Sequence, residues 1–125
     1  MIIVKQDREV GRKAMDVQGA KDVSMQVLIG PDDGSGNIIM RYFTILKGGR
    51  TPVHEHAYEH VVHVQKGKGV VVGPDGGETA LQPGMSVLVP GGVEHQFKSS
   101  SDDPFEFICT IPNLDRLPQA PTCMG

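Results

Sequence analysis

The chain has 125 residues, of which 38% are hydrophobic and 22% charged, with 16 glycines, 9 prolines, 2 cysteines and a formal net charge of -3. This length is enough for one domain with a substantial core, and it leaves no room for a second domain. The negative net charge and the lack of a Lys and Arg cluster argue against nucleic acid or an anionic membrane surface as the main partner.

The first residues give no sign of a targeting or membrane segment. The apolar run 1–4 ends at Lys5, so it is too short for a signal peptide or a membrane-spanning helix. We therefore expect a cytoplasmic protein. Because two cysteines do not make a disulfide framework in a chain of this size without a secretion signal, Cys109 and Cys123 are expected to be reduced thiols.

Short apolar runs alternate with turn sequences as far as residue 112. The turns are rich in Gly, Pro, Asp and Ser, as in 30–34 (Gly-Pro-Asp-Asp-Gly) and 73–77 (Gly-Pro-Asp-Gly-Gly). Strands are expected at residues 2–5, 23–29, 38–47, 52–56, 59–66, 69–73, 78–81, 86–90, 94–98 and 105–112. Many short strands without a long amphipathic helix favour an all-β, double-sheet jelly-roll barrel, which limits exposed strand edges. Residues 113–125 show no alternation and are expected to form a tail.

Four of the five histidines fall in two short segments. The segment 54–60 (His-Glu-His-Ala-Tyr-Glu-His) holds three of them, and the segment 90–95 (Pro-Gly-Gly-Val-Glu-His) ends in His95. A strand at the start of the first segment would place His54 and His56 on one face, and neutral imidazole nitrogen binds first-row transition metals. A single His-x-His pair is often a structural or surface feature, but the glycines and prolines around both segments favour a metal site.

The spacing of these segments resembles the two motifs of the cupin superfamily. The motifs read Gly48-x5-His54-x-His56-x3-His60-x6-Gly67 and Gly84-x5-Pro90-x-Gly92-x2-His95. Neighbouring strand sequences extend the resemblance over roughly residues 1 to 112. The resemblance implies one cupin-type double-stranded β-helix domain at 1–112, followed by the C-terminal tail at 113–125.

In cupins the first motif usually supplies two histidines and a glutamate as metal ligands, and the second supplies one histidine. The resemblance therefore implies His54, His56 and His95 as ligands, with His60 in the usual glutamate position. We favour His60 over Glu59 because the glutamate has the opposite strand parity. The small single-domain cupins that hold manganese with four histidines look most similar, which implies Mn or Fe, while Zn, Ni, Co and Cu also suit imidazole.

Strand alternation predicts which side chains face the interior. The predicted inward residues are Arg41, Phe43, Ile45, Val62, Val64, Phe105, Phe107, Cys109 and Ile111. His63, odd-numbered on the same strand as His60, is expected to face away. The phenylalanines predict a largely apolar cavity for a small, partly hydrophobic substrate.

Four residues near the predicted site each have two interpretations. Arg41 either positions a substrate oxygen atom or pairs with a surface carboxylate. Cys109 is either a small buried hydrophobe or a thiol facing the metal, and the family resemblance supports the second role. Tyr58 is either a hydrogen-bond donor at the pocket mouth or an aromatic residue of its rim. Glu94 either orients a ligand imidazole or is exposed.

The first functional hypothesis is a metal-dependent oxidoreductase of the dioxygenase type, because the predicted inward faces offer no carboxylate as a general base. The alternatives are a metal-dependent decarboxylase or isomerase and a non-enzymatic metal or small-ligand binding module. The expected partner is a small-molecule substrate, with neither nucleic acid nor membrane. A homodimer is also expected, because the apolar strand at 2–5 needs an edge to pair with and Val61 and His63 face outward.

Overall fold

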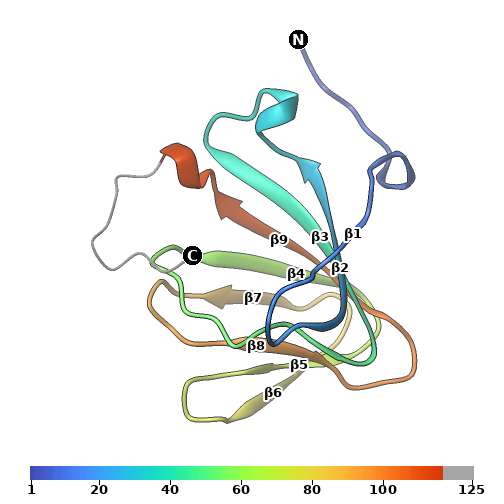
Figure 1. Cartoon of the computed structure of the whole chain (residues 1–125), viewed down its shortest axis with the longest axis vertical. Helices are drawn as coiled ribbons and strands as arrows, with labels where there is room; N and C mark the ends of the chain where they lie inside the picture. Colours follow the sequence, from blue (N-terminus) through green and yellow to red (C-terminus); the bar gives the residue numbers. More distant parts are fainter. Residues whose placement is uncertain (117–125) are drawn as a thin grey trace.

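Nine β-strands and three short 3-10 helices make up the secondary structure of residues 1–116, the part of the chain that the computed structural model describes (Figure 1). Residues 117–125, with Cys123 and most of the expected tail, lie outside the described residues. The strands are β1 (Lys13–Ala14), β2 (Lys21–Ile29), β3 (Ile38–Arg50), β4 (His60–Lys66), β5 (Gly69–Val72), β6 (Glu78–Leu81), β7 (Ser86–Val89), β8 (Gln96–Ser99) and β9 (Phe105–Pro112). The 3-10 helices are η1 (Asp7–Glu9), η2 (Pro31–Asp33) and η3 (Leu114–Arg116). No helix in this part of the chain is long and apolar enough to cross a membrane.

The strands pair antiparallel in one sheet that curls around the interior. β3 connects the two halves, because it pairs with β2 and β9 along its length while its last residue, Arg50, pairs with Lys98 of β8. From β3 the order runs through β9 and β4 to β7 in one direction and through β8 and β5 to β6 in the other. Figure 1 shows β2, β3 and β9 across from β5, β6 and β8, with β4 and β7 between them in this view. The predicted all-β jelly-roll fold is confirmed.

The interior is filled by side chains that alternate along the strands. On β4, His60, Val62 and Val64 are buried, whereas Val61 and His63 are exposed. On β9 every odd-numbered residue is buried and every even-numbered residue is half-buried. The inward faces predicted for these two strands are confirmed, and the alternation places His60 on the same side as the core valines.

Two of the expected strands do not form. Residues 2–5 make no strand pairing within the described chain, because an apolar run becomes a strand only where a neighbour satisfies its backbone groups. The strand expected at 52–56 is reduced to a single bridge between His54 and His95, and Pro52 has no N–H to give to a ladder. The two-residue strand β1 is too short to leave a pattern in the sequence. The other eight predicted strands are confirmed, with ends that differ by at most three residues.

The N-terminal segment is tied to β2 and to the turn after it. The buried side chain of Gln26 donates from Nε2 to the backbone oxygens of Asp7 (2.8 Å) and Val10 (3.0 Å). Lys5 adds an ion pair with Asp33 at 3.0 Å. Residues 5–10 are therefore anchored, while the apolar side chains before them are exposed.

Candidate metal centre

The two histidine segments are held together by backbone hydrogen bonds. His54 N donates to His95 O (2.9 Å), and His95 N donates back to His54 O (2.8 Å). Gly92 N donates to His56 O at 2.6 Å. Position 91 must be glycine for this approach, because a Cβ on Gly91 would lie 2.5 Å from a backbone oxygen of the first segment. The glycines of the second motif therefore bring His95 beside the histidines of the first.

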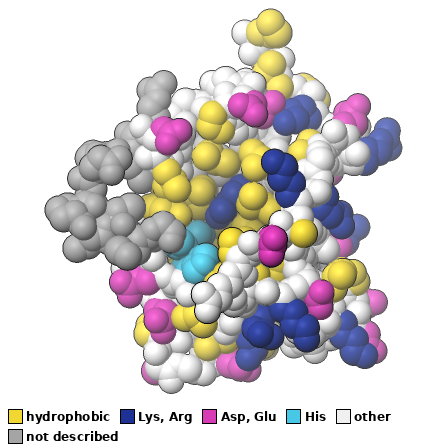
Figure 2. All heavy atoms as spheres, viewed as in Figure 1, with side chains coloured by type: hydrophobic (Ala, Val, Ile, Leu, Met, Phe, Trp, Pro, Cys, Tyr) yellow, Lys and Arg dark blue, Asp and Glu magenta, His cyan; other side chains and the backbone are white. Residues whose placement is uncertain are grey.

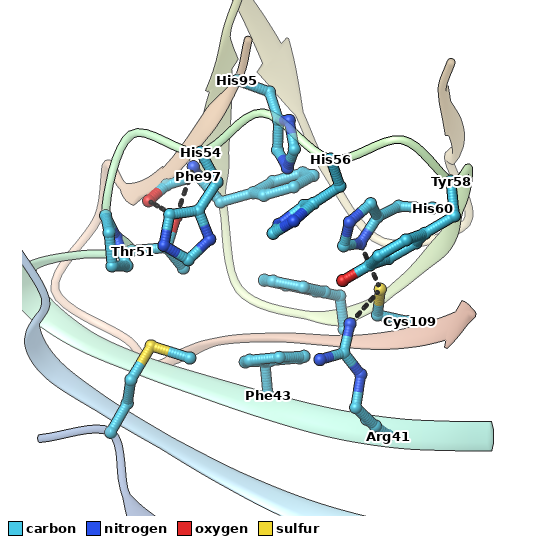
Figure 3. A pocket seen from close by; sticks show the side chains of 13 residues that line it. Arg41, Phe43, Thr51, His54, His56, Tyr58, His60, His95, Phe97 and Cys109 are labelled. Atoms are coloured by element: carbon cyan, nitrogen blue, oxygen red, sulfur yellow. Dashed lines mark hydrogen bonds between the residues drawn. The ribbon is translucent and has the colours of Figure 1, made fainter. Parts of the chain in front are cut away.

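Three buried imidazoles form the centre of the site (Figure 3). The candidate ligand atoms of His56, His60 and His95 lie within 4.8 Å of one another, and the residues are 7%, 6% and 7% exposed. Their ring centroids are 4.9, 5.0 and 5.7 Å apart, with the rings tilted against each other. Two nitrogens that each lie about 2.1 Å from a metal are at most about 4.2 Å apart, so small rotations of these side chains would let them share one ion.

His54 lines the same cavity without belonging to this group of three. It is half-buried, and its ring meets the His56 ring edge to face at a centroid distance of 4.9 Å. Burial lowers the pKa of His54, and the charges of His95 and Arg41 lower it further. The structure thus brings three of the four predicted ligands together and places the fourth beside them.

The hydrogen bonds of the ring nitrogens define which atoms are available as ligands. Nδ1 of His95 lies 3.0 Å from the backbone oxygen of Val93, which can only accept, so Nδ1 carries the proton and a neutral ring presents Nε2. Nε2 of His60 is buried without a hydrogen-bond partner, while its Nδ1 lies 3.2 Å from Sγ of Cys109. Burial, followed by the charge of Arg41, lowers the pKa of His60 to about 3 and keeps the ring neutral near pH 7. A buried, neutral and unpartnered imidazole nitrogen fits a transition-metal site.

A positive charge lies next to the histidines. Arg41 on β3 donates from Nη2 to Sγ of Cys109 at 3.2 Å, and its guanidinium carbon lies 5.0 Å from the ring centre of Phe43. Its Nε is buried without a partner, and the ion pairs found among residues 1–116 do not include this arginine. Pairing of Arg41 with a surface carboxylate is thus not observed in the described chain. Burial raises the pKa of Cys109, and the arginine partly opposes this effect.

These side chains enclose a cavity of about 110 Å³. Its walls are Met15, Arg41, Phe43, Thr51, Pro52, His54, His56, Tyr58, His60, His95, Phe97, Phe107 and Cys109. Apart from the histidines and Arg41 the walls are largely apolar, and no carboxylate is among these residues. Figure 2 shows histidine side chains reaching the surface next to hydrophobic side chains, with acidic and basic side chains mostly around them.

The remaining predicted residues occupy distinct places. Tyr58 lies inside the site, with its ring stacked on that of His56 at a centroid distance of 4.9 Å and an angle of 17°. Glu59 and Glu94 are exposed, as is His63, whose Nδ1 is 2.7 Å from the amide nitrogen of Gln65. The predicted inward residues that belong to the core without lining the cavity are Ile45, Val62, Val64, Phe105 and Ile111.

Four lining residues were not predicted from the sequence. Phe97 follows His95 by two positions on the strand expected at 94–98, so the same parity rule would have found it. Pro52 shares the parity of His54 and His56 in the strand expected at 52–56, so the rule would have found it too, whereas Thr51 precedes that expected strand. Met15 comes from the turn after β1 and reaches the cavity only through the tertiary fold.

Comparison with known proteins agrees with this architecture. The family model of the cupin domain matches residues 41–111. A 1-methylthio-D-xylulose 5-phosphate methylsulfurylase from Rhodospirillum rubrum is 32% identical over 103 residues, which cover 82% of this chain and 64% of the relative. The chain thus spans slightly less than two thirds of that curated relative.

Two solved structures show the same fold. A polyketide cyclase from Streptomyces resistomycificus superposes with a TM-score of 0.85 at 27% identity, covering 90% of this chain and 80% of the other. A cupin-2 domain from Rhodospirillum rubrum superposes with a TM-score of 0.75 at 28% identity, covering 98% of this chain and 82% of the other. With both histidine motifs inside a curled antiparallel sheet, and with the family model matching more than half of its length, the chain belongs to the cupin family.

Proposed function

We propose that this chain is a metal-dependent enzyme whose small, partly apolar substrate binds through oxygen atoms. The observation that carries the proposal is the group of three buried imidazoles, in which Nε2 of His60 has no hydrogen-bond partner. Leaving such an atom unpaired costs about 1–3 kcal/mol, which a bound metal would offset. His54 is proposed as the fourth ligand, because it lines the same cavity and matches the first cupin motif.

Mn²⁺ or Fe²⁺ is the proposed metal. Imidazole nitrogen also suits Zn, Ni, Co and Cu, so the donor atoms alone do not select among them. The preference for Mn or Fe rests on the resemblance to four-histidine manganese cupins. When bound, such an ion would supply Lewis-acid chemistry at a substrate oxygen atom, with its full charge left intact by neutral ligands.

The chain itself supplies a positive charge and a largely apolar wall. Arg41 can hold an anionic or carbonyl oxygen of the substrate, because its Nε has no protein partner and a planar guanidinium suits oxygen pairs. Phe43, Phe97 and Phe107 exclude water from the same space. A cavity of about 110 Å³ is smaller than the roughly 300–1,000 Å³ usual for ligand pockets, so it fits a very small substrate or the reacting end of a larger one.

The first candidate reaction is rearrangement at a ketone group. Polyketides and a xylulose phosphate, which appear in the names of two of the relatives, both carry ketone groups. A ketone oxygen can accept hydrogen bonds from Arg41, and its enolate would gain from the same charge. Without a carboxylate in the described walls, proton transfer in this proposal falls to the hydroxyl of Tyr58.

A dioxygenase-type oxidation, the first hypothesis from the sequence, is the second candidate. It is favoured by the apolar walls and by the lack of a carboxylate among the described lining residues. The two candidates differ in one measurable quantity, since only the oxidation consumes dioxygen.

Metal-free protein reconstituted with Mn²⁺ or with Fe²⁺ provides the test. We would incubate each form with ketose phosphates and β-diketones, follow product formation by mass spectrometry and record dioxygen uptake with an electrode. The matched controls are His60→Ala, which removes a proposed ligand, and His63→Ala, which removes an exposed histidine of the same strand.

Product formation without dioxygen uptake would support the ketone rearrangement, and uptake in step with product would support the oxidation. Either activity must be lost in His60→Ala and kept in His63→Ala. A protein that binds metal tightly and neither binds nor converts any member of the panel would contradict the enzyme proposal and favour a metal-binding module.

A further inference from the structure

The thiol of Cys109 lies between the guanidinium group of Arg41 and the buried imidazole of His60. Cys109 lies on β9, which runs between β3 and β4. In the strand registers it is paired with Arg41 of β3 on one side and with Val62 of β4 on the other. From this position Sγ lies 3.2 Å from Nη2 of Arg41 and 3.2 Å from Nδ1 of His60, as the dashed lines in Figure 3 show. The sulfur therefore has a polar neighbour on each flanking strand.

The partner of Nδ1 matters because an imidazole ring has two nitrogens, and the hydrogen bond of one determines what the other presents. His95 is oriented by the backbone oxygen of Val93. For His60 the neighbour of Nδ1 is Sγ of Cys109, while Nε2 has no partner. A ring that gives its Nδ1 proton to sulfur keeps the lone pair of Nε2 free for a metal. Without that acceptor, the broad χ2 preference of histidine would let the ring turn.

We propose that Cys109 is a positioning residue for the metal ligand His60, and that Arg41 holds the thiol in place for this role. The guanidinium can only donate, so sulfur accepts from Arg41 at one side and faces Nδ1 of His60 at the other. The inference rests on the proposed metal-dependent function, since it assigns a role toward a ligand of that metal. In this proposal the buried thiol does more than fill space in the core.

Packing is the competing explanation, because Cys109 is 2% exposed and belongs to the core cluster. The two explanations separate when volume and hydrogen bonding are changed independently. Cys109→Ser keeps a hydrogen-bonding atom in nearly the same place, whereas Cys109→Val fills the space without one and Cys109→Ala leaves the space empty. Ile111→Val is the matched packing control, being buried two residues further along the same face of β9.

The primary measurement is the affinity of each metal-free variant for Mn²⁺, by competition with a chelator. We expect Cys109→Val and Cys109→Ala to bind Mn²⁺ about 10- to 100-fold more weakly, as for other residues that orient a ligand imidazole. Cys109→Ser and Ile111→Val should stay close to the wild type. Thermal unfolding followed by circular dichroism identifies any variant that fails to fold, and the serine variant remains informative in that case.

Nitrogen NMR of the histidine side chains in the metal-free protein gives a second readout. The wild type and Cys109→Ser should show His60 with its proton on Nδ1, and folded Cys109→Val should show a mixture of tautomers. The proposal is overturned if folded Cys109→Val binds Mn²⁺ and holds the tautomer as the wild type does, or if the serine variant behaves like valine. A wild type that binds neither Mn²⁺ nor Fe²⁺ would instead overturn the proposed metal-dependent function, while the tautomer would still report on Cys109.

Discussion

His60 and Glu59 are neighbours in the chain, yet only the histidine reaches the interior. His60 begins β4 and is buried with the core, whereas Glu59 and His63 are exposed. We therefore predict that His60→Ala loses most of the bound metal, while Glu59→Ala and His63→Ala keep wild-type metal content. Inductively coupled plasma mass spectrometry of the purified variants measures this. Retention of metal in His60→Ala together with its loss in Glu59→Ala would show that the carboxylate is the ligand.

The lowered pKa of His60 predicts how the metal-free protein responds to pH. Burial holds the pKa near 3, against an ordinary value of 6.5, so between these values the unfolded chain binds a proton that the folded chain does not. Stability therefore falls as pH decreases below about 6.5, by at most about 1.4 kcal/mol per pH unit for this one group. Urea unfolding with chelator present, from pH 7 to pH 4, measures the slope. It should become shallower in His60→Gln and stay the same in His63→Gln.

Strand parity, together with the position of His60 in the first cupin motif, was enough to predict several residues of the site. His60, Arg41 and Cys109 each lie on a regular strand whose alternation fixes the face, and the structure places all three around one cavity. Parity could not predict that Sγ of Cys109 contacts nitrogens of both Arg41 and His60, because these contacts depend on the registers of β3, β4 and β9. The position of Met15 was equally out of reach, since it depends on how a two-residue strand pairs.

At the scale of the elements, strands could be predicted where turn residues separate alternating runs. The prediction failed at 52–56, where the backbone makes a single bridge instead of a ladder. It failed again at 2–5, where the apolar character is real but no neighbouring strand is present within the described chain. In both cases the side-chain pattern was typical of a strand. What the sequence did not reveal was whether a neighbouring strand would form hydrogen bonds with the backbone N–H and C=O groups of these residues.

The turn between β4 and β5 gives a quantitative prediction. Gly67 has a φ of 72°, and a Cβ there would lie 2.1 Å from the backbone oxygen of Pro104. Gly67→Ala combines left-handed strain with this clash, so we expect it to lower the free energy of unfolding by about 2–5 kcal/mol.

The matched control is Gly76→Ala, in the turn between β5 and β6. Gly76 also has a positive φ, 81°, but a Cβ there meets nothing within 4 Å. Strain alone should cost about 1–2 kcal/mol. Urea unfolding of both variants measures the difference, and equal losses would mean that the strand end at Pro104 moves aside without cost.

At the scale of the whole molecule, the outer face of the sheet carries a row of three exposed apolar side chains and one threonine across four strands. The registers place Met40 of β3 beside Thr110 of β9, Thr110 beside Val61 of β4, and Val61 beside Leu88 of β7. Val61 and Leu88 are 54% and 58% exposed. Together with the exposed apolar run at 1–4, this row is the reason to expect a second copy of the chain as its cover.

We predict a homodimer at micromolar concentration. Light scattering after size exclusion should give twice the mass of the chain, and Val61→Lys should shift the protein toward the monomer. Val53→Lys is the control, because Val53 is similarly exposed, at 56%, but lies in the loop before the first histidine segment. A monomeric mass for the wild type, or an equal shift in both variants, would argue against this surface as the interface.

The hydrogen bonds that join the two histidine segments also constrain when the site can exist during synthesis. His54 and His95 are roughly forty residues apart, so their bridge is a non-local contact that can form only after the second histidine segment has been synthesised. When a nascent chain has left the ribosome only as far as β7, His56 and His60 are present but the segment that contains Gly92 and His95 is not. The three imidazoles can therefore assemble only once the second histidine segment is available, and any ion captured earlier would be bound by an incomplete set of ligands.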